Sequence, residues 1–136
     1  MATSLVAICA GYPALTAQDR MRSVWDGVYT QAQAERGGEL YNQQCARCHG
    51  RALEGDSYAP QLAGSIFLSD WDGVTLGKLF ARVKDMADNN AGSANPEINA
   101  AILAYILAYN SFPAGSAELP SDRKSLDHIQ FLQTKP

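Results

Sequence analysis

The residues with the clearest chemistry in this chain are Cys45, Cys48 and His49, which together form a C-x-x-C-H motif. This motif is the sequence that attaches a c-type haem covalently. Two thiols three residues apart on a helical turn can add to the two vinyl groups of one porphyrin edge as thioethers. The imidazole of the next residue then lies under the iron and can serve as its proximal ligand. The motif therefore predicts one covalently attached haem c per chain.

Three other interpretations explain the motif less well. A zinc site normally needs four protein ligands, and the only other Cys or His residues are Cys9 and His128, near opposite ends of the chain. A thioredoxin-like C-x-x-C needs a βαβ setting, whereas the sequence around Cys45 is typical of a helix. A disulfide within the motif would leave His49 without a role. We therefore favour haem attachment, with the zinc and dithiol sites as alternatives.

Length and charge exclude several classes of protein. The chain has 136 residues, which is enough for one domain. Its net charge of −3 and pI near 5.2 provide no basic patch for phosphates, so we expect no nucleic-acid partner. No stretch reaches the ~18 apolar residues that a membrane span needs. The hydrophobic share of 46% allows only a small core, of which a buried haem would form a large part.

The first 17 residues resemble a secretory leader. They contain no charged side chain, and an apolar stretch at residues 5–10 precedes a small-residue cleavage site after Ala17. Because no Lys or Arg precedes the apolar stretch, a short buried N-terminal helix is the alternative. We expect residues 1–17 to be removed, Cys9 among them, and residues 18–136 to form a single domain with an N-terminal arm and a C-terminal tail. Such a leader predicts a periplasmic or otherwise exported protein.

The first expected helix precedes the motif and ends at about Gln44. One of its faces carries residues at helical spacing: Ala34, Gly37, Gly38 and Tyr41. Each glycine lowers helix propensity, at a cost of order 1 kcal/mol. We therefore expect the backbone of another element to approach this face closely.

A second helix is expected after a loop-rich stretch at residues 50–74. Thr75 is a candidate N-cap, and the helix ends near Met86, before a polar loop at residues 87–94. Its apolar residues recur at helical spacing: Leu76, Leu79, Phe80 and Val83.

The last long helix is expected between Asn95 and about Asn110. Asn95 is a candidate N-cap and Pro96 suits the first helical position. The segment at residues 19–30 is expected to be an extended arm that packs Trp25, Val28 and Tyr29 on the domain. Five apolar residues are available to anchor the polar tail: Leu119, Leu126, Ile129, Phe131 and Leu132. No segment predicts a strand, so we expect a small all-α fold.

The order of these elements resembles class I cytochrome c over residues 31–112. Gly37 and Tyr41 match the N-terminal helix of that family. Tyr105 matches the aromatic residue of the family's C-terminal helix, which crosses the glycine. The resemblance implies a cytochrome c-like fold of three to four helices around one haem.

The same resemblance implies roles for two more residues. Pro60 matches the proline whose carbonyl binds the other ring nitrogen of the proximal histidine, and Met86 falls where the family keeps its sixth iron ligand. The implied iron ligands are thus His49 and Met86. The implied cofactor-binding residues are Cys45, Cys48, His49, Pro60 and Met86. Many relatives place proline directly after the ligand methionine, whereas Ala87 follows it here, so the methionine–iron bond is expected to be more labile than usual.

Three further segments are similar to those of bacterial cytochromes that accompany, or are fused to, quinoprotein alcohol and sugar dehydrogenases. They lie before the first helix, in the middle of the chain and after the last helix, at residues 23–29, 70–76 and 110–115. This similarity implies a dehydrogenase as electron donor and another cytochrome or an oxidase as acceptor.

The resulting hypothesis is an electron-transfer cytochrome c, not an enzyme. Its iron would be bound by His49 and Met86, with no coordination position open to a substrate. Its acidic surface would favour a partner with a basic rim. The alternative is a five-coordinate haem with peroxidase-like or gas-binding activity, which requires that Met86 is not a firm ligand. A third hypothesis uses His128 as the sixth ligand, and Met21 is an equally distant candidate.

Overall fold

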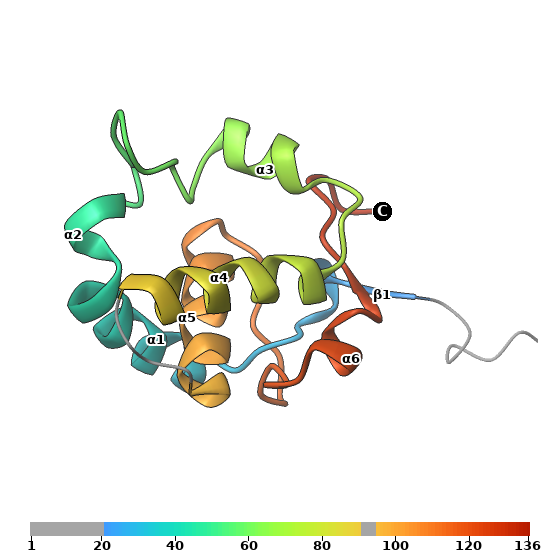
Figure 1. The fold of residues 1–136 in the computed structure, drawn as a ribbon. Helices are drawn as coiled ribbons and strands as arrows, with labels where there is room; N and C mark the ends of the chain where they lie inside the picture. Colours follow the sequence, from blue (N-terminus) through green and yellow to red (C-terminus); the bar gives the residue numbers. More distant parts are fainter. Residues whose placement is uncertain (1–20, 91–94) are drawn as a thin grey trace, which may run out of the picture.

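The structure, a computed structural model, describes residues 21–90 and 95–136. The predicted leader, with Cys9, lies outside the described residues. The elements in chain order are β1 (Arg22–Ser23), the 3-10 turn η1 (Val24–Asp26), α1 (Gln31–Gln44), α2 (Ala46–His49), α3 (Ser65–Trp71), α4 (Leu76–Asn90), α5 (Pro96–Tyr109), α6 (Arg123–Leu126) and β2 (Ile129–Gln130) (Figure 1). The fold is mostly helical, which confirms the all-α prediction. Three helices are long, α3 is shorter, and α2 and α6 are single turns.

Helices α1 and α5 cross in close contact at Gly37. A methyl group at this position would place its carbon 1.8 Å from the carbonyl oxygen of Ala101 and 3.0 Å from the Cβ of Tyr105. The ring of Tyr105 covers Gly38, where a methyl carbon would lie 3.1 Å from the ring. The expected close approach of another backbone is therefore present, and its nearest group is the Ala101 carbonyl. Only a residue without a side chain lets the two helices approach each other this closely.

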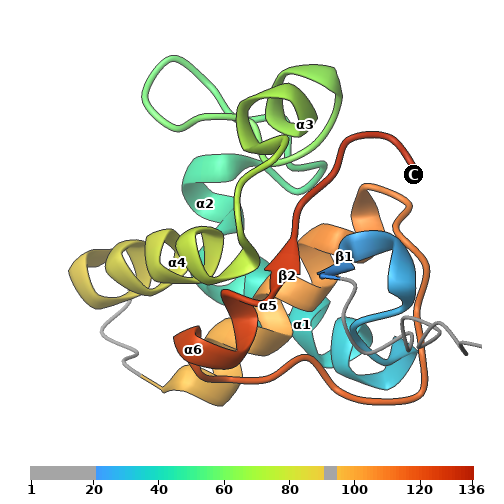
Figure 2. The ribbon, with the colours of Figure 1, turned by 90° about the vertical axis from the view of Figure 1, so that its right-hand side faces the viewer.

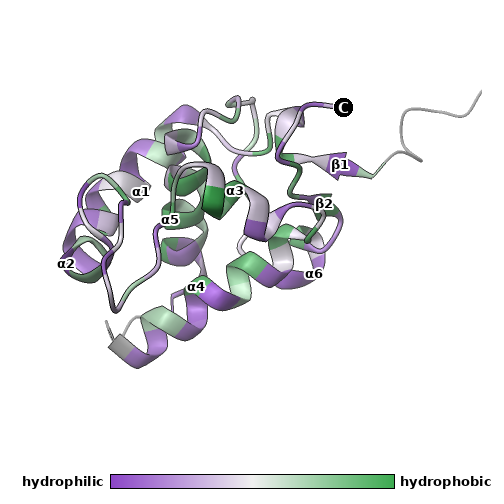
Figure 3. Cartoon of the chain, turned by 90° about the horizontal axis from the view of Figure 1, so that it is seen from above, coloured by the Kyte–Doolittle hydropathy of each residue, from purple (hydrophilic) through white to green (hydrophobic). Residues whose placement is uncertain are grey.

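Helix α5 is the centre of the core. Asn95 caps it by accepting hydrogen bonds from the backbone N–H groups of Glu97 and Ile98 at 2.9 and 3.1 Å, and Pro96 occupies the first turn, as predicted. Its buried residues lie on most of its circumference. Figure 3 shows the resulting apolar helix between α1 and α4. A helix that is apolar nearly all round belongs in the interior.

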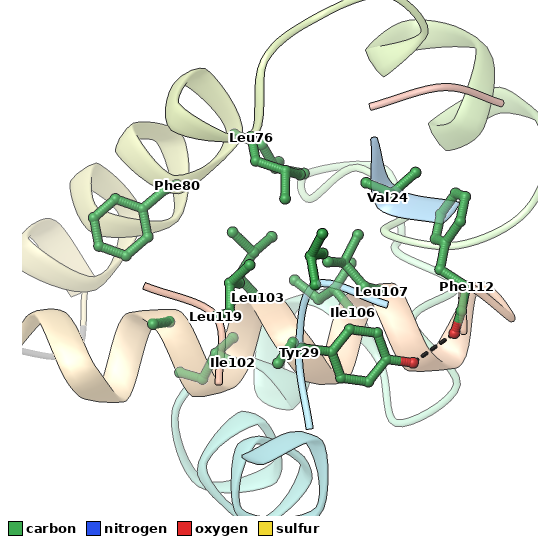
Figure 4. Close-up of a cluster of buried hydrophobic side chains, with 14 of the residues drawn as sticks. Val24, Tyr29, Leu76, Phe80, Ile102, Leu103, Ile106, Leu107, Phe112 and Leu119 are labelled. Carbon is green, nitrogen blue, oxygen red and sulfur yellow. Dashed lines mark hydrogen bonds between the residues drawn. The ribbon is translucent and has the colours of Figure 1, made fainter. Parts of the chain in front are cut away.

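Helix α4 covers α5 and extends farther than predicted. Figure 4 shows Leu76 and Phe80 on the side of α4 that faces α5. The helix does not end near Met86 but continues to Asn90. The added turn buries Ala87 and is supported on its exposed side by an ion pair between Lys84 and Asp88 at 2.6 Å. Asp88 and Asn89 in this turn face solvent, and such a polar composition is typical of a loop as well as of an exposed helical turn.

The N-terminal arm and the C-terminal tail pack against each other. Strands β1 and β2 form a parallel pair in which Arg22 is opposite Ile129, and Figure 2 shows them side by side. The expectation of no strand was therefore wrong, and the arm is not fully extended because it contains η1. The packing of Trp25 on the domain is confirmed, since its indole N–H donates to the Leu132 carbonyl at 2.9 Å.

The tail is anchored through its apolar residues as expected. Leu119, Leu126, Ile129 and Phe131 are buried. Within the ranges that the structure describes, no helix combines the length and the apolar character needed to cross a membrane.

Candidate haem site

The C-x-x-C-H motif lies on a single helical turn that continues directly from α1. The N–H of Cys45 donates to the Tyr41 carbonyl at 2.8 Å, which completes the last turn of α1. The N–H groups of Cys48 and His49 then donate to the Cys45 carbonyl at 3.1 and 2.9 Å. This one turn fixes the relative positions of the two thiols and the imidazole, as the sequence predicted.

Both cysteines of the motif are free thiols. Cys45 is half-buried and Cys48 is exposed, and no disulfide joins them. Burial, followed by the neighbouring Cys48, raises the pKa of the Cys45 thiol to about 11. Cys45 is therefore a protonated thiol at neutral pH. Because neither cysteine is in a disulfide, both thiols are free to form thioethers with vinyl groups.

The imidazole of His49 is oriented by Pro60. Its Nδ1 lies 2.8 Å from the carbonyl oxygen of Pro60, which is the contact predicted for this pair. A carbonyl oxygen can only accept a hydrogen bond, so Nδ1 must carry the ring proton. In the neutral ring Nε2 then keeps its lone pair and can bind a metal ion. The contact thus selects the tautomer that an axial ligand requires.

A tight loop holds the Pro60 carbonyl in place. The Gly55 N–H donates to the His49 carbonyl at 2.8 Å. The Asp56 carboxylate accepts hydrogen bonds from the backbone N–H groups of Tyr58 and Ala59 at 2.7 and 2.8 Å, and these bonds lower the pKa of Asp56. An Asp side chain that binds the backbone two and three residues on closes such a turn.

The end of α5 supports the chain after Pro60. The Asn110 side-chain amide donates to the Leu62 carbonyl at 2.9 Å and accepts from the Gly64 N–H at 3.1 Å. Sequence reasoning missed the roles of both Asp56 and Asn110. Asp56 could have been found from the turn preference of aspartate, whereas the role of Asn110 depends on a contact across more than forty residues.

Met86 lies in the C-terminal half of α4, one turn after Val83 and half-buried. Figure 1 shows that this end of α4 and α2 are on the same side of the molecule. The expectation that a loop follows Met86 directly was wrong, because α4 continues to Asn90. The bond between Met86 and iron stays a prediction.

The other candidate ligands are far from the motif. Met21 and His128 are exposed and flank β1 and β2. Figure 1 places these strands at the opposite end of the molecule from α2. Neither residue therefore shares a site with His49 in this fold.

The chemistry of these donors fits a c-type haem. One helical turn presents two free thiols and an imidazole whose Nε2 has the lone pair in the neutral ring, and Met86 of α4 carries a thioether. Apolar side chains between Pro60 and Trp71 are also incompletely buried: Leu62, Ala63, Ile66 and Leu68. Tyr58 beside Pro60 is 98% exposed. A flat apolar cofactor would cover surface of this kind.

Comparison with known proteins gives a family match. The family model described as cytochrome c oxidase, cbb3-type, subunit III matches residues 32–106, which is more than half of the chain. The matched stretch runs from α1 into α5 and includes the motif, Pro60 and Met86. Neither the curated proteins nor the solved structures contain a match to the chain.

Proposed function

The chain belongs to the cytochrome c family whose model is described as subunit III of cbb3-type cytochrome c oxidase, and on this premise we propose that it carries single electrons between two redox proteins. Haem-based electron transfer is the general function of this family, and covalently attached haem c is its cofactor. When bound, the haem iron supplies the chemistry by cycling between Fe(II) and Fe(III). The observation that carries the proposal is the His49 ring, oriented by Pro60 directly beside two free thiols.

In this proposal each residue of the site has a separate role. Cys45 and Cys48 hold the cofactor as thioethers, and Nε2 of His49 binds the iron. Pro60 keeps the proton on Nδ1, which makes Nε2 a stronger donor. Met86 supplies a thioether from α4 as sixth ligand, leaves no open position for a substrate, and raises the reduction potential because soft sulfur favours Fe(II).

We propose a periplasmic quinoprotein dehydrogenase as electron donor and a cytochrome or oxidase of the respiratory chain as acceptor. The support is the similarity at residues 23–29, 70–76 and 110–115. Segments from all three contact one aromatic cluster around Phe131, in which ring centroids of Trp25 and Phe112 are 4.9 Å apart and those of Phe112 and Phe131 are 5.2 Å apart. Residues 73 and 74 join it through hydrogen bonds to the Phe131 backbone at 2.8 Å.

Because these segments pack together, their similarity to those cytochromes reflects a shared local structure. The proposed electron donor therefore needs a direct test. Co-purification of a quinoprotein dehydrogenase with the chain from its own cells would support the donor assignment, and its absence from the eluate would contradict it. The proposed domain begins at residue 18 after removal of residues 1–17. The intact mass of the protein recovered from the periplasmic fraction tests both the cleavage and the location.

The assignment of Met86 as the sixth iron ligand is tested by replacing it. Met86→Ala should lower the reduction potential, open the iron to carbon monoxide or azide, and remove the weak far-red absorption band that marks methionine–iron ligation in this class. Met21→Ala is the matched control and should keep the wild-type spectrum. A high-spin ferric spectrum in the wild type would instead support the five-coordinate alternative. An unchanged spectrum and potential in Met86→Ala would contradict the ligand assignment.

A further inference from the structure

The hydroxyl group of Tyr41 connects α1 to the turn that follows His49. Tyr41 is fully buried, and its Oη donates to the carbonyl oxygen of Gly50 at 2.7 Å. The N–H of Leu53 reaches the same carbonyl at a longer distance of 3.3 Å. The shorter bond, from the Tyr41 hydroxyl, is therefore the main constraint on the Gly50 carbonyl.

Gly50 is the point at which the chain leaves α2. Its N–H donates to the Ala46 carbonyl at 2.9 Å, and its φ of 79° lies in the region that favours glycine. The preceding His49 carbonyl accepts the Gly55 N–H at 2.8 Å. The backbone of His49 is thus held on its C-terminal side by this turn, while its ring is held by Pro60.

The ring of Tyr41 is itself held by the crossing of α1 and α5. Its centroid lies 5.3 Å from that of Tyr105, whose side chain covers Gly38. A buried ring packed against the central helix has little freedom, so its hydroxyl presents a fixed hydrogen bond to the turn. The position of His49 is therefore coupled through Tyr41 to the close crossing of α1 and α5.

We propose that the Tyr41 hydroxyl is a positioning group for His49. The proposal rests on the proposed function, in which His49 binds the iron. Phenylalanine at position 41 would keep the ring contact with Tyr105 but could not hold the Gly50 carbonyl. The turn would then open more often, and the His49 ring would no longer be confined to one orientation.

Tyr29 offers a matched control. It is also a buried tyrosine, 2% exposed, and its hydroxyl also donates to a backbone carbonyl, that of Phe112 (Figure 4). Its partner belongs to the aromatic cluster around Phe131 and not to the haem motif. Tyr41→Phe and Tyr29→Phe each remove one buried hydroxyl and leave one carbonyl short of a donor, so both should lower the denaturation midpoint to a similar extent.

The test compares these two variants as haem-loaded, reduced proteins. Tyr41→Phe alone should speed hydrogen exchange at the Gly55 amide by about fivefold, the effect of losing one net hydrogen bond. It alone should also shift the NMR signals of the His49 ring and the reduction potential. Tyr29→Phe should keep wild-type values in all three measurements.

Two results would overturn the proposal, and they are distinguishable. If Tyr41→Phe matches Tyr29→Phe in Gly55 exchange, His49 signals and potential, the hydroxyl has only a structural role and the positioning proposal is wrong while the proposed function stands. If the wild-type chain carries no covalent haem, the proposed function fails and this proposal fails with it.

Discussion

Replacing Gly37 with alanine should destabilise the protein strongly, because the new methyl group has no space. Its carbon would lie 1.8 Å from the Ala101 carbonyl oxygen, 1.6 Å short of the 3.4 Å at which ordinary contact begins. The obstacle is backbone and cannot rotate away, so α1 and α5 must move apart. That movement would also loosen the packing of Tyr41 and Ala34, which the same face of α1 buries.

The expected magnitude is the balance of two effects. Alanine gains about 1 kcal/mol of helix propensity over glycine, whereas overpacking costs about 1–3 kcal/mol and occasionally more. Because the clash is with backbone, we expect the upper end of that range and a net loss of about 2 kcal/mol. For a domain of this size such a loss lowers the melting temperature by roughly 5–10 °C.

Gly38→Ala is the control for this prediction. Its methyl carbon would meet only the ring of Tyr105, at 3.1 Å, and a side chain can yield by a few tenths of an ångström. The gain in propensity should then offset most of the cost and leave stability within about 1 kcal/mol of the wild type. The assay is denaturant unfolding of the haem-loaded protein followed by far-UV circular dichroism. A Gly37→Ala protein as stable as the wild type, or a Gly38→Ala protein that loses as much, would refute the close-crossing argument.

Substitutions at three other positions test the loop and the core. Asp56 has a lowered pKa in the folded protein, so the stability from its backbone hydrogen bonds is present above the unfolded pKa of about 3.9 and is lost as pH falls through the folded value. Asp56→Ala should remove this acid dependence and loosen the His49 contact, whereas Asp56→Asn should keep the turn. Equal melting curves for the two variants at pH 7 would contradict the role of the turn. Asn110→Ala should lower the free energy of unfolding by about 1–2 kcal/mol, because the Leu62 carbonyl and the Gly64 N–H both lose their partner, and a neutral effect in denaturant unfolding would show that this link is dispensable. Asn99 is fully buried, and neither polar atom of its side-chain amide has a hydrogen-bond partner among the described residues. Asn99→Leu should therefore raise stability by about 1 kcal/mol, and a loss would show that the amide has a partner in the haem-loaded protein.

The features that the sequence predicted well are those determined by neighbouring residues. The C-x-x-C-H turn, the α5 start at Asn95 and Pro96, and the glycine face of α1 each depend on patterns within one or two helical turns. The contact between His49 and Pro60 was accessible only through family resemblance, because Pro60 lies eleven positions after His49, across an irregular loop.

The features that sequence reasoning missed depend on distant parts of the chain. The pairing of β1 with β2 joins residues more than a hundred positions apart, and two-residue strands leave no periodic pattern to detect. Helix α6 is a single turn that begins at the Asp122 cap, whose carboxylate accepts the Ser125 N–H at 2.8 Å, and it persists because Leu126 is buried. Short helices of this kind depend on tertiary packing more than on propensity.

The central claim is that Cys45 and Cys48 bind haem covalently, and one measurement tests it most directly. The chain is expressed together with a haem-attachment system, extracted with acid acetone, and run on a denaturing gel with haem staining, beside a Cys45→Ala/Cys48→Ala variant. The colour should stay with the wild-type polypeptide and be absent from the variant. Colour that leaves the wild-type polypeptide during extraction would contradict covalent attachment through Cys45 and Cys48.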